Sequence, residues 1–261
     1  MTALSLPVWI YCQALKRLRR RAFSTTLGSL NPAISRSAVI LSAVGDAPFW
    51  LTPAPGGLNN VGGQLKLNLA AAGVSPDDVD TVLLTHCHPD HIGGLLDAEQ
   101  RPVFPHAELH LHPLEAQYWQ DDEKRKIAGE RGQRNFALAR QTLDAYAQNL
   151  RFFSGDQIAA GILPVWLPGH TPGHTGFRID SGDKSFLIWG DIAHYPHIQS
   201  ARPDVSILFD VDPALAKETR RTVLQQAARE KLMIGGMHLG HKGFATILMN
   251  DKGYRISYAE E

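Results

Sequence analysis

The sequence is poor in cysteine, in net charge and in long apolar runs, and each shortage excludes a class of protein. It contains two cysteines, Cys12 and Cys87, which are far apart and give no support to a disulfide framework. Lys and Arg total 26, as do Asp and Glu, so the formal net charge is zero. Such a chain has no overall field to gather nucleic acid or an anionic membrane surface. We therefore expect no nucleic-acid partner and no membrane partner.

Acidic residues are absent from positions 1–45, which contain six basic residues: Lys16, Arg17, Arg19, Arg20, Arg21 and Arg36. A secretory signal places its basic residues before the apolar stretch, whereas here LSLPVWIYCQAL precedes KRLRRR, which disfavours Sec export. The Arg-rich, acid-free composition is typical of an organellar transit segment, but a bacterial start-site extension or a solvated basic arm has the same composition. We predict a basic leader over residues 1–45, a catalytic domain over 46–261, and a cytoplasmic location with organellar targeting as the alternative.

Beyond residue 46, strand-like and helix-like segments alternate without an internal repeat, which predicts an α/β fold with helices packed outside its sheets. Helical spacing of apolar residues predicts helices at 62–73, 114–125, 136–150 and 213–231, and HIGGLL at 91–96 is expected to open another. Short apolar runs predict strands within 81–86, 108–113, 164–179, 184–194, 232–238 and 253–260.

The segment THCHPDH, residues 85–91, follows one of these apolar runs and is dense in side chains that bind metals. In an extended loop, side chains two apart point the same way, so His86 and His88 can converge on one point while Asp90 and His91 turn toward another. Imidazole and carboxylate are ligands for zinc, iron, manganese or nickel. The alternative is a polar surface loop, which the preceding apolar strand disfavours.

Three further candidate ligands also follow apolar runs: His170 in LPGHTPGH, Asp191 in LIWGDIAH and His238 in IGGMHLG. With HxHxDH in front of them, the order resembles the metallo-β-lactamase superfamily over roughly residues 55 to 261. The resemblance implies a four-layer αββα sandwich. It also implies two metal sites, whose ligands are His86, His88 and His170 for the first, Asp90, His91 and His238 for the second, and Asp191 as the bridge.

What the resemblance implies for function is a dinuclear metal-dependent hydrolase with two divalent ions, zinc in the first place, and a metal-bridging hydroxide as nucleophile. A metal-activated water removes the need for a serine or cysteine nucleophile, and we expect Asp90 to help orient it. Manganese, iron, cobalt and nickel suit the same ligands. We expect a small uncharged ester, lactone or organophosphate as substrate, and the chain is compatible with a homodimer.

His194 lies three residues after Asp191 and is the second candidate catalytic residue besides Asp90. Relatives that open N-acyl-homoserine lactones carry Tyr there, whereas residues 189–221 are more similar to the methyl parathion hydrolase branch. His194 could hydrogen-bond the leaving group or the substrate oxygen, or be structural. Tyr195 is a weaker alternative.

The other histidines and aromatic residues near the motifs have plainer interpretations. His174 is expected to support the site rather than bind metal, and Cys87, which points away from its neighbours, to be a structural thiol. We expect the remainder to pack in the core or face solvent, with a pocket-lining role as the alternative for some: His106, His110, His112, Tyr118, Trp119 and His241.

The resemblance fails in front of HxHxDH, where relatives carry a β-hairpin that ends in an aspartate-glycine turn. Strand character survives in AVILSAV, but PAPGG at 53–57 lacks the acidic residue, so the first sheet is expected to be altered and metal affinity lowered. Functional alternatives are a glyoxalase-II-like thioesterase or a mononuclear-iron persulfide dioxygenase of the same fold. No cluster of basic residues for glutathione accompanies the motifs, and a nucleic-acid-processing enzyme or a β-lactamase proper has less support.

Overall fold

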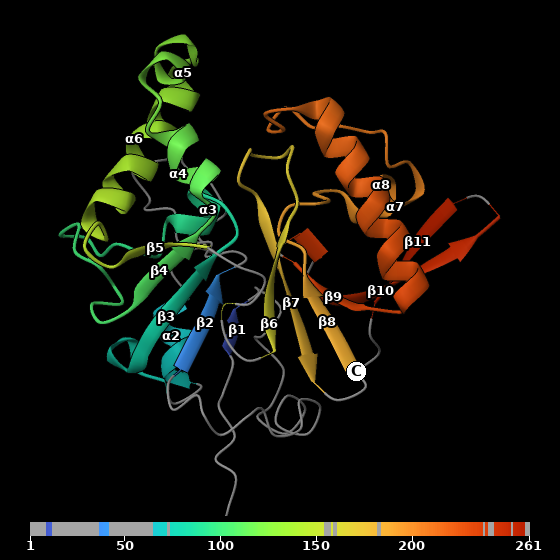
Figure 1. Ribbon diagram of the computed structural model, residues 1–261, viewed down its shortest axis with the longest axis horizontal. Helices are drawn as coiled ribbons and strands as arrows, with labels where there is room; N and C mark the ends of the chain where they lie inside the picture. The colour runs from blue at the N-terminus through green and yellow to red at the C-terminus, as the bar shows by residue number, and fades with distance from the viewer. Residues whose placement is uncertain are drawn as a thin grey trace, which may run out of the picture. The chain divides into compact units, whose positions relative to one another are not determined.

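The computed structural model describes residues 9–11, 37–41, 65–71, 74–153, 158, 161–181, 184–236, 238–239, 243–251 and 253–258. The chain divides into two compact units (Figure 1). We call one the parallel-sheet unit, whose described residues lie within 9–11 and 37–153, and the other the mixed-sheet unit, whose described residues lie within 158–258.

The parallel-sheet unit is built on five strands that all run parallel. In sheet order they are β1 (Trp9–Tyr11), β2 (Ser37–Leu41), β3 (Val79–Leu84), β4 (Glu108–Leu111) and β5 (Leu150–Phe152). The helical elements are α2 (Leu65–Ala71), the 3₁₀ helix η4 (Pro76–Asp78), α3 (Pro89–Ile92), α4 (Pro113–Trp119), α5 (Asp122–Ile127) and α6 (Glu130–Ala145). Parallel strands require crossover connections, and helical elements lie in those from β2 to β3, from β3 to β4 and from β4 to β5.

The core of this unit lies between the sheet and its helices. Val82 and Leu84 of β3 are fully buried in one cluster with Trp119 of α4 and with Phe136 and Ala139 of α6. A parallel sheet covered by helices favours such continuous apolar strands, which is why β3 can be recognised from sequence. Burial of β3 in this core fixes the position of its carboxyl end, where the histidine segment begins.

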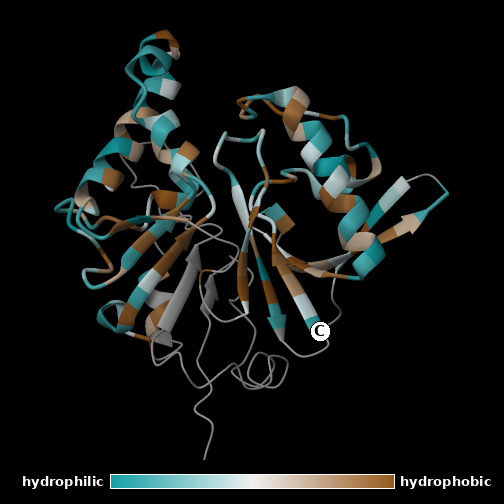
Figure 2. Ribbon diagram, in the orientation of Figure 1, coloured by the Kyte–Doolittle hydropathy of each residue, from teal (hydrophilic) through white to brown (hydrophobic). Residues whose placement is uncertain are grey.

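The mixed-sheet unit has six strands in the order β11 (Gly253–Tyr258), β10 (Phe244–Asn250), β9 (Met233–Gly235), β8 (Lys184–Ile188), β7 (Thr175–Ser181) and β6 (Ile162–Trp166). Only β8 and β9 pair in parallel, and the long helix α8 (Pro213–Glu230) connects them; the short helix α7 (Pro196–Ala201) precedes it. Val223, Leu224 and Ala227 of α8 pack with Leu187 of β8 and Ile234 of β9. The other side of α8 is hydrophilic, and Figure 2 shows the two kinds of residue alternating along it.

The expected fold class, two sheets with helices packed on them, is confirmed. Strands β1, β2 and β3 pair in parallel, so these described strands form no hairpin with one another. Strand β1 was not expected, since three residues are too few to show alternation. Strands β1 and β2 both lie within the proposed leader of residues 1–45; its other residues, and PAPGG, lie outside the described residues. Among the described helices, none has the length and hydropathy needed to cross a membrane.

One predicted element is wrong. HIGGLL was expected to open a helix, but α3 begins earlier, at Pro89, and is capped by Gly93 after a single turn. Proline is favoured in the first turn of a helix, and the glycine pair at 93–94 weakens its continuation. Asp90 and His91 therefore lie within a helical turn, whereas His88 keeps the extended backbone expected for it, with φ −66° and ψ 152°.

Candidate metal centre

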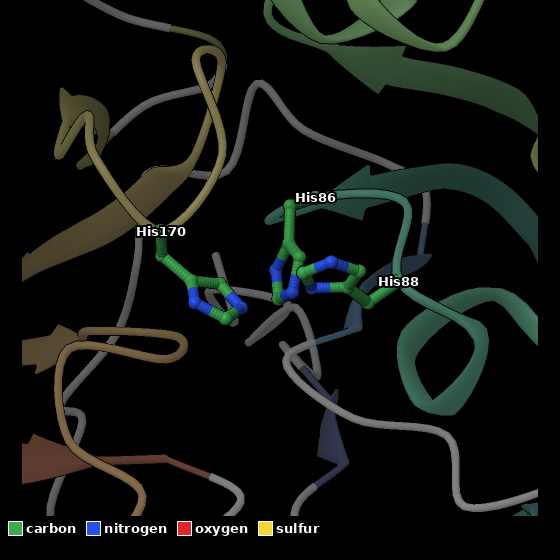
Figure 3. A group of neighbouring side chains, drawn as sticks. All are labelled: His86, His88 and His170. Carbon is green, nitrogen blue, oxygen red and sulfur yellow. The ribbon is translucent and has the colours of Figure 1, made fainter. Parts of the chain in front are cut away.

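The parallel-sheet cluster, which consists of His86, His88, Asp90 and His91, is assembled at the carboxyl end of β3. Figure 3 shows His86 and His88 projecting from the segment that follows this strand. The ring of His86 lies 4.0 Å from that of His91 and 4.9 Å from that of His88, centroid to centroid. Asp90 Oδ2 lies 3.6 Å from His91 Nε2. Four residues that the sequence singled out are thus brought together within this unit.

Thr85 orients two of these rings. Its hydroxyl oxygen lies 3.2 Å from His86 Nδ1 and 3.4 Å from His91 Nδ1, and all three residues are buried. A hydroxyl oxygen has two lone pairs, so Thr85 can accept a hydrogen bond from the Nδ1–H of both rings at once. With Nδ1 directed to Thr85, each ring has Nε2 on its opposite side as the atom suited to a metal.

Cys87, between the first two histidines, is structural as expected. Its side chain is 1 % exposed, and its backbone N–H donates to Glu115 Oε1 at 2.9 Å. The same carboxylate oxygen accepts from Trp119 Nε1 at 2.7 Å, and the Trp119 ring meets His88 edge to face. Burial, and then the negative charge of Glu115, raise the pKa of the Cys87 thiol well above its usual value. A thiol held protonated in this way is neither a nucleophile nor a metal ligand at neutral pH.

The mixed-sheet cluster consists of His170, Asp191, His194 and His238, from three loops that follow β6, β8 and β9. Three imidazole nitrogens converge on one oxygen, Asp191 Oδ2: the Nε2 atoms of His194 at 3.0 Å, and of His170 and His238 at 3.4 Å each. Asp191 itself is 2 % exposed. A carboxylate oxygen has two lone pairs and is crowded by three N–H donors, whereas a bound cation would suit the nitrogens of His170 and His238 as ligands.

His170 carries a feature typical of metal-binding histidines. Its Nδ1 atom lies 3.0 Å from Asp210 Oδ1, with both side chains buried, so Nε2 faces Asp191 as the coordinating atom. Although burial lowers it, hydrogen bonds to Asp191 and Asp210 raise the pKa of His170 to about 9. The surroundings of this ring are therefore strongly negative and favour a cation, so these residues fit a divalent metal.

His194 differs from His170 in the surroundings of its Nδ1 atom. The ligand atoms of His170, Asp191 and His194 lie within 4.8 Å of one another, so geometry alone would allow all three on one ion. However, within the described part of the chain His194 Nδ1 is buried without a hydrogen-bond partner. A metal on Nε2 would place the ring proton on that partnerless Nδ1, which is costly, whereas an Nε2–H that donates to Asp191 avoids this. Burial lowers the pKa of His194, so the ring is neutral at pH 7 and acts as a donor.

His174 supports the loop of Asp191, which agrees with its expected supporting role. Its Nδ1 bonds to the Leu167 carbonyl at 2.8 Å, and its Nε2 accepts the backbone N–H of Asp191 at 2.9 Å. Gly190 makes this approach feasible, since its φ is +57° and an added Cβ would lie 2.3 Å from His174 Nε2. The second histidine of GHTPGH therefore fixes the backbone of a candidate metal ligand.

The remaining candidates take ordinary positions. His112 caps α4 by accepting the Leu114 N–H, His110 pairs with Glu108, and His106 is exposed. Tyr118 and Trp119 pack against the parallel-sheet core, with Trp119 at the edge of His88. Tyr195 is 61 % exposed at the start of α7. His241 lies outside the described residues.

Three supporting residues were missed from sequence: Glu115, Asp210 and Arg220. A signal for Arg220 was present, because the buried positions of α8 include Ala216, Val223 and Ala227, and Arg220 shares their helical spacing. A charge within an apolar stripe needs a buried partner. Asp210 Oδ2, 3.6 Å from Arg220 Nη2, is that partner. Asp210 itself lies in a loop, where no periodicity marks it.

Comparison with known proteins places the chain in a family. It is 28% identical to probable metallo-hydrolases of Mycobacterium bovis and Mycobacterium tuberculosis over 163 residues, 60% of this chain and 51% of each relative. The chain thus spans about half the length of these curated relatives. Among solved structures it is similar to the hydrolase AbOPH of the beta-lactamase superfamily, with a TM-score of 0.74 and 27% identity. It is also similar to AidC, a dizinc quorum-quenching lactonase, with a TM-score of 0.76 and 25% identity. Each likeness covers 86% of this chain and 76% of the other.

The family model of the metallo-beta-lactamase superfamily matches residues 55–238, a range that runs from before the parallel-sheet cluster to the last residue of the mixed-sheet cluster. The family resemblance noted from HxHxDH and the later ligand positions is therefore confirmed. The chain belongs to the metallo-β-lactamase superfamily.

Proposed function

We propose that the protein is a dinuclear metal-dependent hydrolase that cleaves small uncharged esters, lactones or phosphotriesters. The observation that carries the proposal is the convergence of three imidazole Nε2 atoms on Asp191 Oδ2. The Nδ1 atom of one of these rings, His170, is hydrogen-bonded to Asp210. His86, His88 and His170 would hold the first ion and Asp90, His91 and His238 the second, with Asp191 as a ligand that both ions would share.

The family match supports these ligand sets, because it spans every one of the seven residues. Nitrogen and oxygen donors of this kind suit zinc first, and manganese, iron, cobalt or nickel as well. AidC, described as a dizinc lactonase, supports zinc by its similarity. When bound, such ions supply a water of lowered pKa as nucleophile and polarise the substrate oxygen.

The chain's own residues then orient and stabilise the reactants. Asp90 is half-exposed at the start of α3, where its carboxylate can accept a hydrogen bond from the attacking water. His194 is neutral and has its Nε2 beside Asp191, so its N–H can turn to the substrate oxygen or to the departing oxygen. Thr85, His174, Asp210 and Glu115 keep the ligands and their loops in place.

An apolar surface beside His194 supports the proposed substrate class. The ring of Phe209 lies 6.3 Å from that of His194 and is 43% exposed, and its neighbour Leu208 is fully exposed. Val211 is 41% exposed in the same segment. Exposed apolar side chains beside a catalytic group favour an uncharged aryl or acyl portion of the substrate over a glutathione carboxylate. This favours the lactonase and methyl parathion hydrolase branch over the glutathione-dependent branches.

The test combines elemental analysis of the purified protein with a substrate panel. The panel holds p-nitrophenyl esters, γ- and δ-lactones, a paraoxon-type triester and S-lactoylglutathione. Two metal ions per chain together with turnover of the oxygen esters support the proposal. A single iron with glutathione-dependent oxygen uptake, or turnover confined to S-lactoylglutathione, would contradict it.

The role of His194 is tested by His194→Ala. We expect turnover to fall about 100-fold or more, which is typical of a lost general acid or oxyanion donor, while metal content is unchanged. Comparing phenyl acetate with p-nitrophenyl acetate separates the two roles, since a proton donor to the leaving group matters most for the poorer one. His106→Ala, at an exposed position, is the matched control. Unchanged turnover in His194→Ala would make His194 structural.

A further inference from the structure

Arg220 lies in the middle of α8 with its side chain buried, although α8 is otherwise apolar on that side. It is 1% exposed and forms hydrogen bonds to three backbone carbonyls. Its Nε donates to Ile192 O at 2.6 Å, and its Nη1 donates to Pro203 O at 2.8 Å and to Val205 O at 2.9 Å. Its Nη2 lies 3.6 Å from Asp210 Oδ2. The planar guanidinium therefore contacts three backbone carbonyls and one carboxylate at the same time.

Two of these contacts lead directly to candidate metal ligands. Ile192 follows Asp191 in the chain, so the Nε bond holds the backbone of the Asp191 loop. Asp210 connects Arg220 to His170, because its Oδ1 lies 3.0 Å from His170 Nδ1.

The backbone strengthens the same connection. The N–H of Val211 donates to His170 O at 3.0 Å, and the N–H of Asp212 donates to Gly169 O at 2.9 Å. The segment that carries Asp210 is thus bonded along the loop of His170. This segment and the Arg220 contacts together join the loop of His170 to the loop of Asp191, and these two residues are 21 positions apart in sequence.

We propose that Arg220 is a positioning residue of the metal centre, which fixes the loops of Asp191 and His170 relative to each other through Ile192 O and Asp210. This inference rests on the proposed function, since it assumes that Asp191 and His170 bind metal. Its physical basis is that a ligand ring fixed by a carboxylate loses less conformational freedom on binding an ion, and a carboxylate fixed by a buried cation holds the ring more firmly.

The experiment measures zinc affinity by competition with a chelator, together with the absorption spectrum of the cobalt(II)-loaded protein, which reports ligand geometry. Arg220→Lys keeps the charge but cannot reach Asp210 and the carbonyls at once, and Asp210→Asn removes the charged link to His170. We expect each to lower zinc affinity about 10- to 100-fold and to alter the cobalt spectrum. Arg221→Met is the control, because Arg221 is the next residue of α8 and pairs with Glu218 at the surface.

The outcomes distinguish the inference from the proposed function. If the wild-type protein binds no zinc or cobalt, the proposed function fails. If the wild-type protein binds both while a folded Arg220→Lys protein keeps wild-type zinc affinity and cobalt spectrum, Arg220 is only structural and the inference is wrong. Should Arg220→Lys not fold, Asp210→Asn decides by the same two measurements. A purely structural role would lower the unfolding temperature of the metal-free protein without changing the spectrum of the loaded one.

Discussion

Gly190 is the residue on which the backbone of Asp191 depends most directly. Its φ of +57° lies in the left-handed region, and His174 occupies the space where a side chain would start. We expect Gly190→Ala to be destabilised by more than the ~1–2 kcal/mol of the backbone conformation alone, because His174 must also move. Urea unfolding of the metal-free protein measures this. Gly129→Ala is the control, since its φ is −63° and an added Cβ meets nothing within 4 Å. Equal stability of the two variants would contradict the interpretation.

Cys87 gives a second prediction at the scale of a single residue. Burial and the nearby Glu115 keep its thiol protonated, so it should not react with a thiol reagent in the folded protein. In a Cys12→Ser variant Cys87 is the only cysteine, and we expect about zero thiols to react under native conditions and one in denaturant. Rapid native labelling of this variant would show that the segment between His86 and His88 opens readily, in conflict with the bond from its N–H to Glu115.

At the scale of elements, the amino end of α8 is where helix stability and the site meet. Asp212 Oδ1 accepts from Ala214 N at 3.1 Å and Leu215 N at 3.0 Å, which caps the helix that carries Arg220. We expect Asp212→Ala to lose about 1 kcal/mol of unfolding free energy, whereas Asp212→Asn, which keeps the acceptor oxygen, should lose less. Denaturant melts of both variants test this. An Asn variant as unstable as the Ala variant would show that charge, rather than the cap bond, is what matters.

The elements also show what sequence can and cannot reveal. Strands β3 and β8 were predictable because buried parallel pairing favours uninterrupted apolar runs, and the loops that carry His86 and Asp191 follow these two strands. Strand β10 has no counterpart among the predicted elements, since its last three residues are exposed and break the alternation, and α7 is too short for periodicity to show. Ligand types can be recognised from local spacing. Their supports cannot, because Glu115 and Asp210 act across 28 and 40 residues of sequence.

At the scale of the whole molecule, the two units have separate cores, one around Val82 and Phe136 and the other around Leu187 and Val223. The proposed ligand sets combine residues of the 85–91 segment with residues from 170–238, so bound metal should stabilise the folded state of the whole chain. Ligands that bind only the native state stabilise it by mass action, about 4 kcal/mol at a concentration 1,000 times Kd. For a chain of this size that corresponds to a rise in Tm on the order of 10 °C.

We therefore expect the zinc-loaded protein to melt in one transition, and the chelator-treated protein to melt lower, in a broader or divided transition. Calorimetry with and without chelator measures both effects. The variant His170→Ala removes a proposed ligand of the first ion and should show a smaller difference in Tm between the two conditions, whereas the exposed-site variant His106→Ala should behave as the wild type. If chelator leaves the Tm and the shape of the wild-type transition unchanged after zinc loading, the ions do not stabilise the folded chain, and the proposed ligand sets are wrong.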